Sequence, residues 1–150
     1  MPSRERIEHF ITQVEQGRYV EAIEEFYTEE ATAQENLESP LRGRKLLIAN
    51  ERGVLRSFEA VRTVPGTWYL LDGDRAVIRW VFEFIRRDGH RFTQDELAHQ
   101  RWIGDRIDEE RFYYDPAQQH LGATLRVRQT IGKLFLRAGF MRAKQRSSQL

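Results

Sequence analysis

Apolar residues recur every three or four positions through the first 58 residues, which is the spacing of helices that bury one face. The pattern predicts three helices, at residues 3–16, 18–27 and 45–58. Ser3 is placed to cap the first helix and Gly17 to end it. Between the second and third helices the chain is expected to be extended or irregular, with a loop at Pro40 and Gly43.

From residue 60 the apolar period changes to two, which is typical of strands. Runs rich in Val, Ile, Trp and Phe cover residues 60–71, 75–87, 90–103 and 106–114, the first of them interrupted at Pro65 and Gly66. Asp88 and Gly89 between two such runs are a hairpin signal. Three helices followed by a four-stranded antiparallel meander predict an α+β domain with its helices on one face of the sheet.

Composition narrows the class of protein. A chain of 150 residues is long enough for one domain with a sizeable core. It contains no cysteine, which excludes disulfides and thiolate metal sites and favours a reducing cytoplasm. No apolar run approaches the roughly 20 residues that cross a bilayer. The basic start MPSRERIEHF is not followed by an apolar run, so a signal peptide is not expected.

The charges divide the chain into two parts. Residues 1–115 hold 17 basic and 23 acidic side chains, whereas the chain after Asp115 holds seven basic and no acidic ones. We therefore predict a domain over residues 1–116 and a basic tail over residues 117–150. The tail is amphipathic at helical spacing, with apolar positions at Ile131, Leu134, Phe135, Ala138 and Met141.

Two interpretations of the tail stay open. It packs on its own domain or on a dimer partner, as most amphipathic helices of soluble proteins do, or it contacts a membrane surface or an acidic partner. Nucleic acid is not an expected partner, because the acidic body of the protein would repel phosphates.

Five segments carry a family resemblance, and it lies in their order rather than in any one of them: FYTEEATAQEN, LRGR, GDRAVIRWVFEF, DGHRFTQDELAHQRW and GDRIDEERFYYDP. In this order they resemble the superfamily of SnoaL-like polyketide cyclases, nuclear transport factor 2 and ketosteroid isomerase, over roughly residues 4–116. The resemblance implies a cone-shaped α+β barrel in which a curved antiparallel sheet and three helices enclose a pocket. That fold hosts isomerases, cyclases, dehydratases, epoxide hydrolases and binding modules, so it does not fix the function.

The resemblance places Glu35 where ketosteroid isomerases hold their base. A carboxylate set against Phe26 and strand aromatics is partly desolvated, which raises its pKa toward that of a useful base. The tyrosine and aspartic acid that stabilise the oxyanion in those isomerases fall on Phe10 and Ala98, which cannot donate hydrogen bonds. Ketosteroid isomerisation by that mechanism is therefore not expected.

The epoxide hydrolases of the fold pair an arginine with two aspartates. Arg79 matches the arginine, but Val81 and Phe112 stand where the acids would be. The four histidines form no i, i+4 pair and no ligand cluster, and no phosphate-binding loop is present, so neither a metal nor a cofactor is expected.

The hairpin turn sets the register of the two central strands. With residue 87 opposite residue 90, one face carries Arg79, Val81, Glu83 and Ile85 together with Phe92, Gln94, Glu96, Ala98, Gln100 and Trp102. The family resemblance turns this face, joined by Glu110, Phe112 and Tyr114, toward the pocket. The opposite face would carry Trp80, Phe82 and Phe84, which suit the homodimer interface common in the family. One bulge would exchange the two faces.

The carboxylates gathered by this register lead to two hypotheses. In the first, the protein is an acid–base isomerase, cyclase or dehydratase acting on a small apolar carbonyl compound, with Glu35 and Glu96 as catalytic residues. Its ligand-binding residues would be Phe26, Asn36, Arg79, Glu83, Gln100, Glu110, Phe112 and Tyr114, although Asn36 also suits a bond to the turn backbone. In the second, it is a non-catalytic binding or interaction module, and the acids form ion pairs and a solvated rim.

Overall fold

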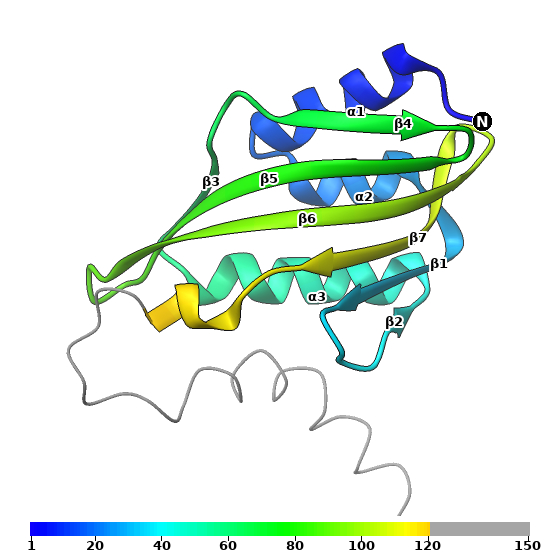
Figure 1. The fold of residues 1–150 in the computed structure, drawn as a ribbon. Helices are drawn as coiled ribbons and strands as arrows, with labels where there is room; N and C mark the ends of the chain where they lie inside the picture. The colour runs from blue at the N-terminus through cyan, green and yellow to red at the C-terminus, as the bar shows by residue number, and fades with distance from the viewer. Residues whose placement is uncertain (121–150) are drawn as a thin grey trace, which may run out of the picture.

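Three helices lie on one face of a curved sheet (Figure 1), in a computed structural model that describes residues 1–120. They are α1 (Arg4–Glu15), α2 (Tyr19–Phe26) and α3 (Arg44–Ser57), which confirms the three predicted helices to within two residues at each end. The Ser3 hydroxyl accepts a hydrogen bond from the Arg6 amide at 3.1 Å, and Gly17 has a φ of 75° where α1 ends. The predicted amphipathic stretch, residues 125–144, lies outside the described residues.

The sheet has more strands than the sequence predicts. They are β1 (Tyr27–Glu35), β2 (Leu41–Arg42), β3 (Ala60–Thr63), β4 (Trp68–Asp72), β5 (Arg75–Ile85), β6 (Arg91–Ile103) and β7 (Arg106–Tyr113). The order is β2-β1-β7-β6-β5-β3, and β4 also pairs with β5. Residues 27–35 form β1 and run parallel to β7, so the sheet is mixed rather than antiparallel. Residues 29–36 were expected to be extended or irregular, and Tyr27 was expected to end the second helix.

The register between β5 and β6 differs by one residue from the predicted one. Ile85 pairs with Arg91, and the Arg86 amide donates to the His90 carbonyl at 2.8 Å, so the loop holds three residues instead of two. Gly89 permits this loop because its φ is 85°, a conformation that the last residue of such a loop requires. A slip of one residue turns every side chain of a strand to the other face.

The observed register exchanges the two predicted faces of β5. Trp80, Phe82 and Phe84 point toward the helices, so they cannot form the predicted interface on the outer face. The inner residues of β6 are as predicted, because that strand alternates buried and exposed side chains along its length. The core therefore lies between the helices and the inner face, around Phe10, Phe26, Ile78, Trp80 and Trp102.

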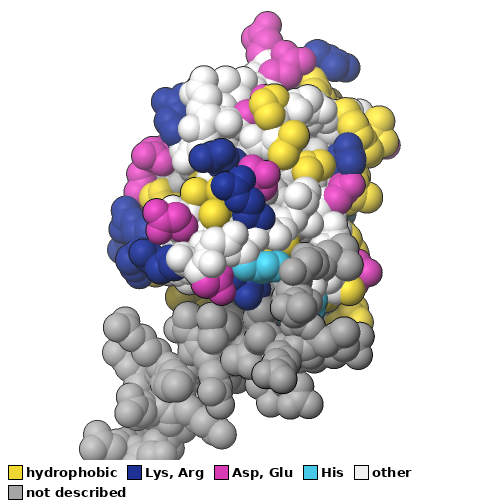
Figure 2. Space-filling model, turned by 90° about the vertical axis from the view of Figure 1, so that its left-hand side faces the viewer, with side chains coloured by type: hydrophobic (Ala, Val, Ile, Leu, Met, Phe, Trp, Pro, Cys, Tyr) yellow, Lys and Arg dark blue, Asp and Glu magenta, His cyan; other side chains and the backbone are white. Residues whose placement is uncertain are grey.

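The outer face of the sheet carries different apolar residues from those predicted. Figure 2 shows hydrophobic side chains gathered along the edge where this face lies, while acidic and basic ones are interspersed over the rest of the view. Its exposed members include Trp68, Leu70, Leu97 and Tyr113. A homodimer through the outer face stays a prediction, now resting on these residues. Within residues 1–120 there is no helix of the length and apolar character that crossing a membrane requires.

Two tryptophans test the corrected register. Trp80 is 2% exposed and Trp68 is 45% exposed. We expect Trp80→Ala to lower the free energy of unfolding by about 3–5 kcal/mol through the lost packing and the enlarged cavity. We expect Trp68→Ala to change it by no more than about 0.5–1 kcal/mol. Urea unfolding of both variants measures the difference, and a larger loss for Trp68→Ala would contradict the register.

Candidate functional site

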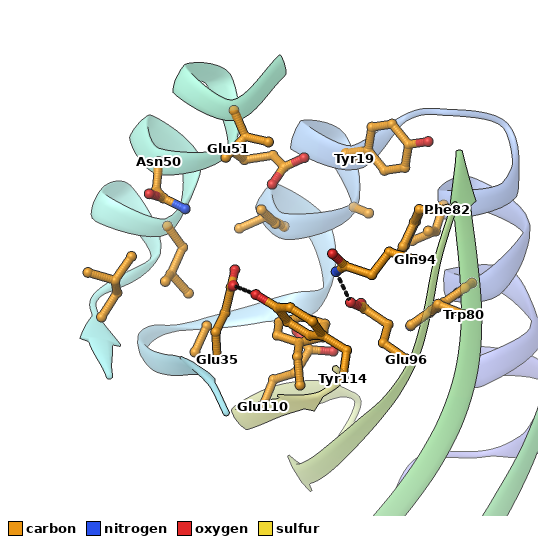
Figure 3. A pocket seen from close by; sticks show the side chains of 18 of the residues that line it. Tyr19, Glu35, Asn50, Glu51, Trp80, Phe82, Gln94, Glu96, Glu110 and Tyr114 are labelled. Carbon is orange, nitrogen blue, oxygen red and sulfur yellow. Dashed lines mark hydrogen bonds between the residues drawn. The ribbon is translucent and has the colours of Figure 1, made fainter. Parts of the chain in front are cut away.

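A cavity of about 500 Å³ opens between α2, α3 and the inner face of the sheet (Figure 3). Much of its wall is apolar, with aromatic rings from every layer of the fold: Phe10, Tyr19, Tyr27, Trp80, Phe82, Phe84, Phe112 and Tyr114. The exposed lining residues Glu35, Glu38, Ser39, Pro40 and Leu46 mark its mouth. An apolar pocket with a few convergent polar groups is the usual form of a small-molecule site.

Five of the predicted site residues line this cavity. Glu35 lies at the end of β1, Glu96 on β6, Glu110 and Phe112 on β7, and Tyr114 just after β7. Glu96 and Glu110 are buried, at 6% and 4% exposure, and Glu35 stands at the mouth. The fold thus brings together three carboxylates from three strands, while their catalytic and binding roles stay predictions.

The other predicted site residues lie elsewhere. Arg79 and Glu83 are on the outer face because of the register shift, and Arg79 donates to both oxygens of Asp95, at 3.0 and 2.6 Å. Phe26 is fully buried in the core, with the Arg6 guanidinium 3.8 Å from its ring centre. It is therefore not the wall against which Glu35 was expected to lie.

Asn36 and Gln100 support the site from outside the cavity. Asn36 has a φ of 46°, and its side-chain oxygen accepts a hydrogen bond from the Tyr114 amide at 3.0 Å. Of its two predicted roles, ligand binding or a bond to the backbone, the structure shows the bond to the backbone. Gln100 is fully buried and donates to Glu110 at 2.6 Å. Both hold residues that line the cavity and do not line it themselves.

Sequence reasoning missed a fourth carboxylate, Glu51 of α3. It follows Leu47 by four positions and precedes Val54 by three, so all three lie on one helical face, and all three line the cavity. A glutamate inside such an apolar stripe was the signal that could have found it. Trp80, Phe82 and Phe84 were assigned to the outer face, and Gln119 lies in the predicted tail.

Buried hydrogen bonds fix Glu110. The Trp102 indole donates to the Gln100 side-chain oxygen at 3.0 Å, and Gln100 donates in turn to one oxygen of Glu110 at 2.6 Å. The Tyr27 hydroxyl donates to the other oxygen. With both oxygens accepting, Glu110 is held in one position in the floor of the cavity.

The remaining carboxylates are less firmly held. Gln119 of the 3₁₀ helix η1 (Pro116–His120) donates to Gln94 at 3.0 Å, and Gln94 donates to one oxygen of Glu96 at 2.6 Å. The Tyr114 hydroxyl donates to Glu35. Within residues 1–120, the side chain of Glu51 has no hydrogen-bond or ion-pair partner (Figure 3). The carboxylates thus range from doubly bonded Glu110 to unpartnered Glu51.

Burial shifts the acidity of this cluster. Desolvation is the largest cause in each case, and it raises the pKa of Glu96 to about 8 and the pKa values of Glu51 and Glu110 to about 7. The neighbouring carboxylates add repulsion at Glu96 and Glu51. At neutral pH the cluster therefore holds both neutral acids and charged carboxylates, which are the two forms that acid–base catalysis needs.

Glu35 is both exposed to water and partly desolvated. It stands exposed at the cavity mouth, and the protein around its carboxylate raises its pKa by desolvation, with repulsion from Glu38 as a smaller cause. The hydrogen bond from Tyr114 acts in the opposite direction. This donor favours the charged form, so Glu35 is suited to act as a base.

Among residues 1–120, no group of three or more His, Asp or Glu side chains is arranged to hold a metal ion. The lining of the cavity in the same part of the chain contains no lysine, arginine or histidine. The site as described offers carboxylates, amides, hydroxyls and aromatic rings to a ligand.

The comparison with protein families agrees with this architecture. The sequence matches the SnoaL-like domain over residues 7–110. The chain belongs to the SnoaL-like domain family. This family assignment confirms the resemblance seen in the ordered motifs. A search of curated proteins found no match.

Solved structures share the SnoaL-like fold. A candidate SnoaL-like polyketide cyclase from Mesorhizobium loti is 23% identical, with a TM-score of 0.63 over 76% of this chain and all of that one. TerC, crystallised with polyporic acid, is 16% identical, with a TM-score of 0.66 over 78% of this chain and 94% of that one. A protein of ketosteroid isomerase-like fold from Catenulispora acidiphila, in complex with trimethylamine, is 16% identical, with a TM-score of 0.63 over 73% and 87%.

The raised pKa values make stability depend on pH. Because the folded state holds protons on Glu51, Glu96 and Glu110 that the unfolded state has released, stability is greatest near and below pH 4.5 for these groups and falls as the pH rises to about 8. We expect the free energy of unfolding to fall between pH 5.5 and pH 8.5 by on the order of 2 kcal/mol or more. Urea titrations at the two pH values measure it.

Glu96→Gln should flatten this dependence, since it removes one of the groups that must lose a proton inside the protein. Glu30→Gln is the matched control, because Glu30 is an exposed residue of β1 whose ion pair with Arg42 is also exposed. A slope left unchanged by Glu96→Gln would contradict the assignment of a neutral carboxyl to this residue.

Proposed function

We propose that the protein is an enzyme that moves protons on a small, largely apolar carbonyl compound bound in the cavity, as isomerases, cyclases and dehydratases do. The observation that carries the proposal is the placement of Glu35, Glu51, Glu96 and Glu110 around one aromatic cavity that has no basic side chain among the described residues. Carboxyls with raised pKa values in an apolar cleft are typical of acid–base sites.

Glu35 is the proposed base. Its position at the mouth lets its proton exchange with solvent, and the Tyr114 hydroxyl steadies its charged form. Partial desolvation raises the pKa of Glu35 and so strengthens its carboxylate as a base. In the proposed step, Glu35 takes a proton from the carbon beside the carbonyl group and later returns it to the substrate.

Glu96 is the proposed acid that faces the carbonyl oxygen. Ala98 and Phe10 carry no donor where ketosteroid isomerases have theirs, but Glu96 lies two residues before Ala98 on the same inner face of β6. With a pKa of about 8 it is mostly protonated at neutral pH, so it can donate a hydrogen bond to the developing oxyanion. Glu96 would thus serve as the oxyanion donor that Phe10 and Ala98 cannot supply.

Two structural neighbours support a small-molecule occupant. TerC was crystallised with polyporic acid, and the Catenulispora acidiphila protein is in complex with trimethylamine. The family name and the Mesorhizobium loti neighbour also point to cyclase chemistry. The reaction itself is argued from the carboxyl groups of this chain.

Deuterium exchange tests the proposal without knowledge of the natural substrate. In D₂O, the protein should speed the incorporation of deuterium beside the carbonyl group of 2-tetralone, a small benzo-fused cyclic ketone, as followed by proton NMR. Glu35→Gln should lower the enzymatic rate by about 10²–10⁴-fold, because removal of a general base costs that much. Glu96→Gln should lower it as well.

Glu30→Gln serves as the control, since its side chain lies outside the cavity on the same strand. Binding of 2-tetralone is measured in parallel by calorimetry. A ketone that binds without exchange faster than in buffer would remove the catalytic role and favour the binding module instead. An equal exchange rate in Glu35→Gln would remove the role of Glu35 alone.

A further inference from the structure

The carboxylates of the cavity lack the arginine partners that several acids outside it have. On the surface, Arg6 contacts Glu25 at 2.7 Å, Arg79 contacts Asp95 at 2.6 Å, and Arg101 contacts Asp108 at 2.7 Å. In the cavity, the acids are Glu35, Glu38, Glu51, Glu96 and Glu110, and the described part of the chain supplies no basic lining residue. Buried carboxylates without a positive partner are costly, which is why they retain protons.

Glu51 shows this imbalance most directly. Its side chain extends from α3 into the cavity (Figure 3), and within residues 1–120 it has no hydrogen-bond or ion-pair partner. The repulsion that it feels comes from Glu35 and Glu110. A half-buried acid that faces the cavity and is repelled by other acids lacks a partner that a ligand can provide.

The walls also suit a positive charge. Phe82 lines the cavity from β5, and Trp80 packs beside it in the wall, with ring centroids 5.9 Å apart and planes 30° from parallel. Tyr19 of α2 packs edge-on against Phe82, with ring centroids 6.2 Å apart. Aromatic faces attract organic cations, and most strongly where water is excluded.

We propose that the ligand of this cavity carries an organic cation, a protonated or quaternary amine, held beside Glu51 and against the aromatic wall of the cavity, while Glu96 faces the carbonyl group. The inference rests on the proposed function in that it names the class of its substrate: an amine that also bears a carbonyl group and an apolar body. A metal ion is the alternative cation, but no group of three His, Asp or Glu side chains in residues 1–120 is placed to hold one.

Binding of such a cation must release protons from the cavity. The titratable groups that face it are the carboxyls of Glu35, Glu38, Glu51, Glu96 and Glu110. The hydroxyls of Tyr19, Tyr27 and Tyr114 also face it, but their pKa values are raised above 10, so they stay neutral through the physiological range. A fixed positive charge therefore binds more tightly as the pH rises and the carboxyls ionise.

A matched pair of probes tests the inference in the full chain. Phenyltrimethylammonium carries a permanent charge, and tert-butylbenzene is its uncharged isostere. By calorimetry at pH 8, the cation should bind at least about tenfold more tightly than the isostere. Its affinity should rise by about tenfold between pH 6 and pH 8, whereas the affinity of the isostere should not rise.

Glu51→Gln should lower the affinity for the cation by about tenfold, since it removes one negative charge beside it, and should leave the isostere unaffected. Glu24→Gln is the control, because Glu24 is an exposed acid of α2 outside the cavity. The pH series on the unaltered protein keeps the test intact if Glu51→Gln does not fold.

Each negative result has a distinct meaning. Equal or tighter binding of the isostere, an affinity for the cation that does not rise with pH, or no binding of the cation at pH 8 would overturn the inference. The exchange experiment with 2-tetralone, which is neutral, does not depend on these results. If the protein catalyses exchange but does not prefer the cation, only the inference of an amine ligand is wrong. If it prefers the cation but does not catalyse exchange, only the proposed catalysis is wrong.

Discussion

The pairing of β5 with β6 is the constraint on which the cavity depends. These two long strands are in register from Arg75 and Arg101 to Ile85 and Arg91. A slip of one residue would bring Arg79 inside and turn Trp80 out, so an apolar wall would be exchanged for a charge. The positive φ of Gly89 at the hairpin permits the three-residue loop that selects the observed register.

The cavity also lowers the stability of the fold, because burying acidic groups opposes folding. Hydrogen-bond donors offset the free energy cost of this burial to a different extent for each carboxyl group. Glu110 receives two hydrogen bonds and behaves as part of the framework, Glu96 receives one, and Glu51 receives none from the described residues. The groups that the framework leaves least satisfied are those with most freedom to respond to a ligand. Stability given up at such positions is a common feature of functional sites.

The sequence predicts what depends on local periodicity. The three helices and the alternation of β6 were predictable because burial of one face leaves a direct trace in the order of apolar residues. The parallel pairing of β1 with β7 was not, because it joins segments about 80 residues apart and leaves no local period. The faces of β5 were missed for a smaller reason: a loop of two or of three residues suits the same Asp88 and Gly89. Glu96 was placed on the correct face by the alternation of β6, and Glu35 and Glu110 were placed by the family resemblance, whereas Glu51 was passed over as one charge among many on a helix.

The family match ends at residue 110, but the cavity does not. Tyr114, which bonds Glu35, and Gln119, which begins the amide chain to Glu96, both come after that limit. Glu35, Glu96 and Glu110 therefore lie within the matched residues, while the hydroxyl that bonds Glu35 and the first amide of the chain to Glu96 come from the segment after them. A chain trimmed to residues 7–110 would keep the three strand carboxylates but lose the hydroxyl that bonds Glu35 and the amide that holds Gln94 beside Glu96.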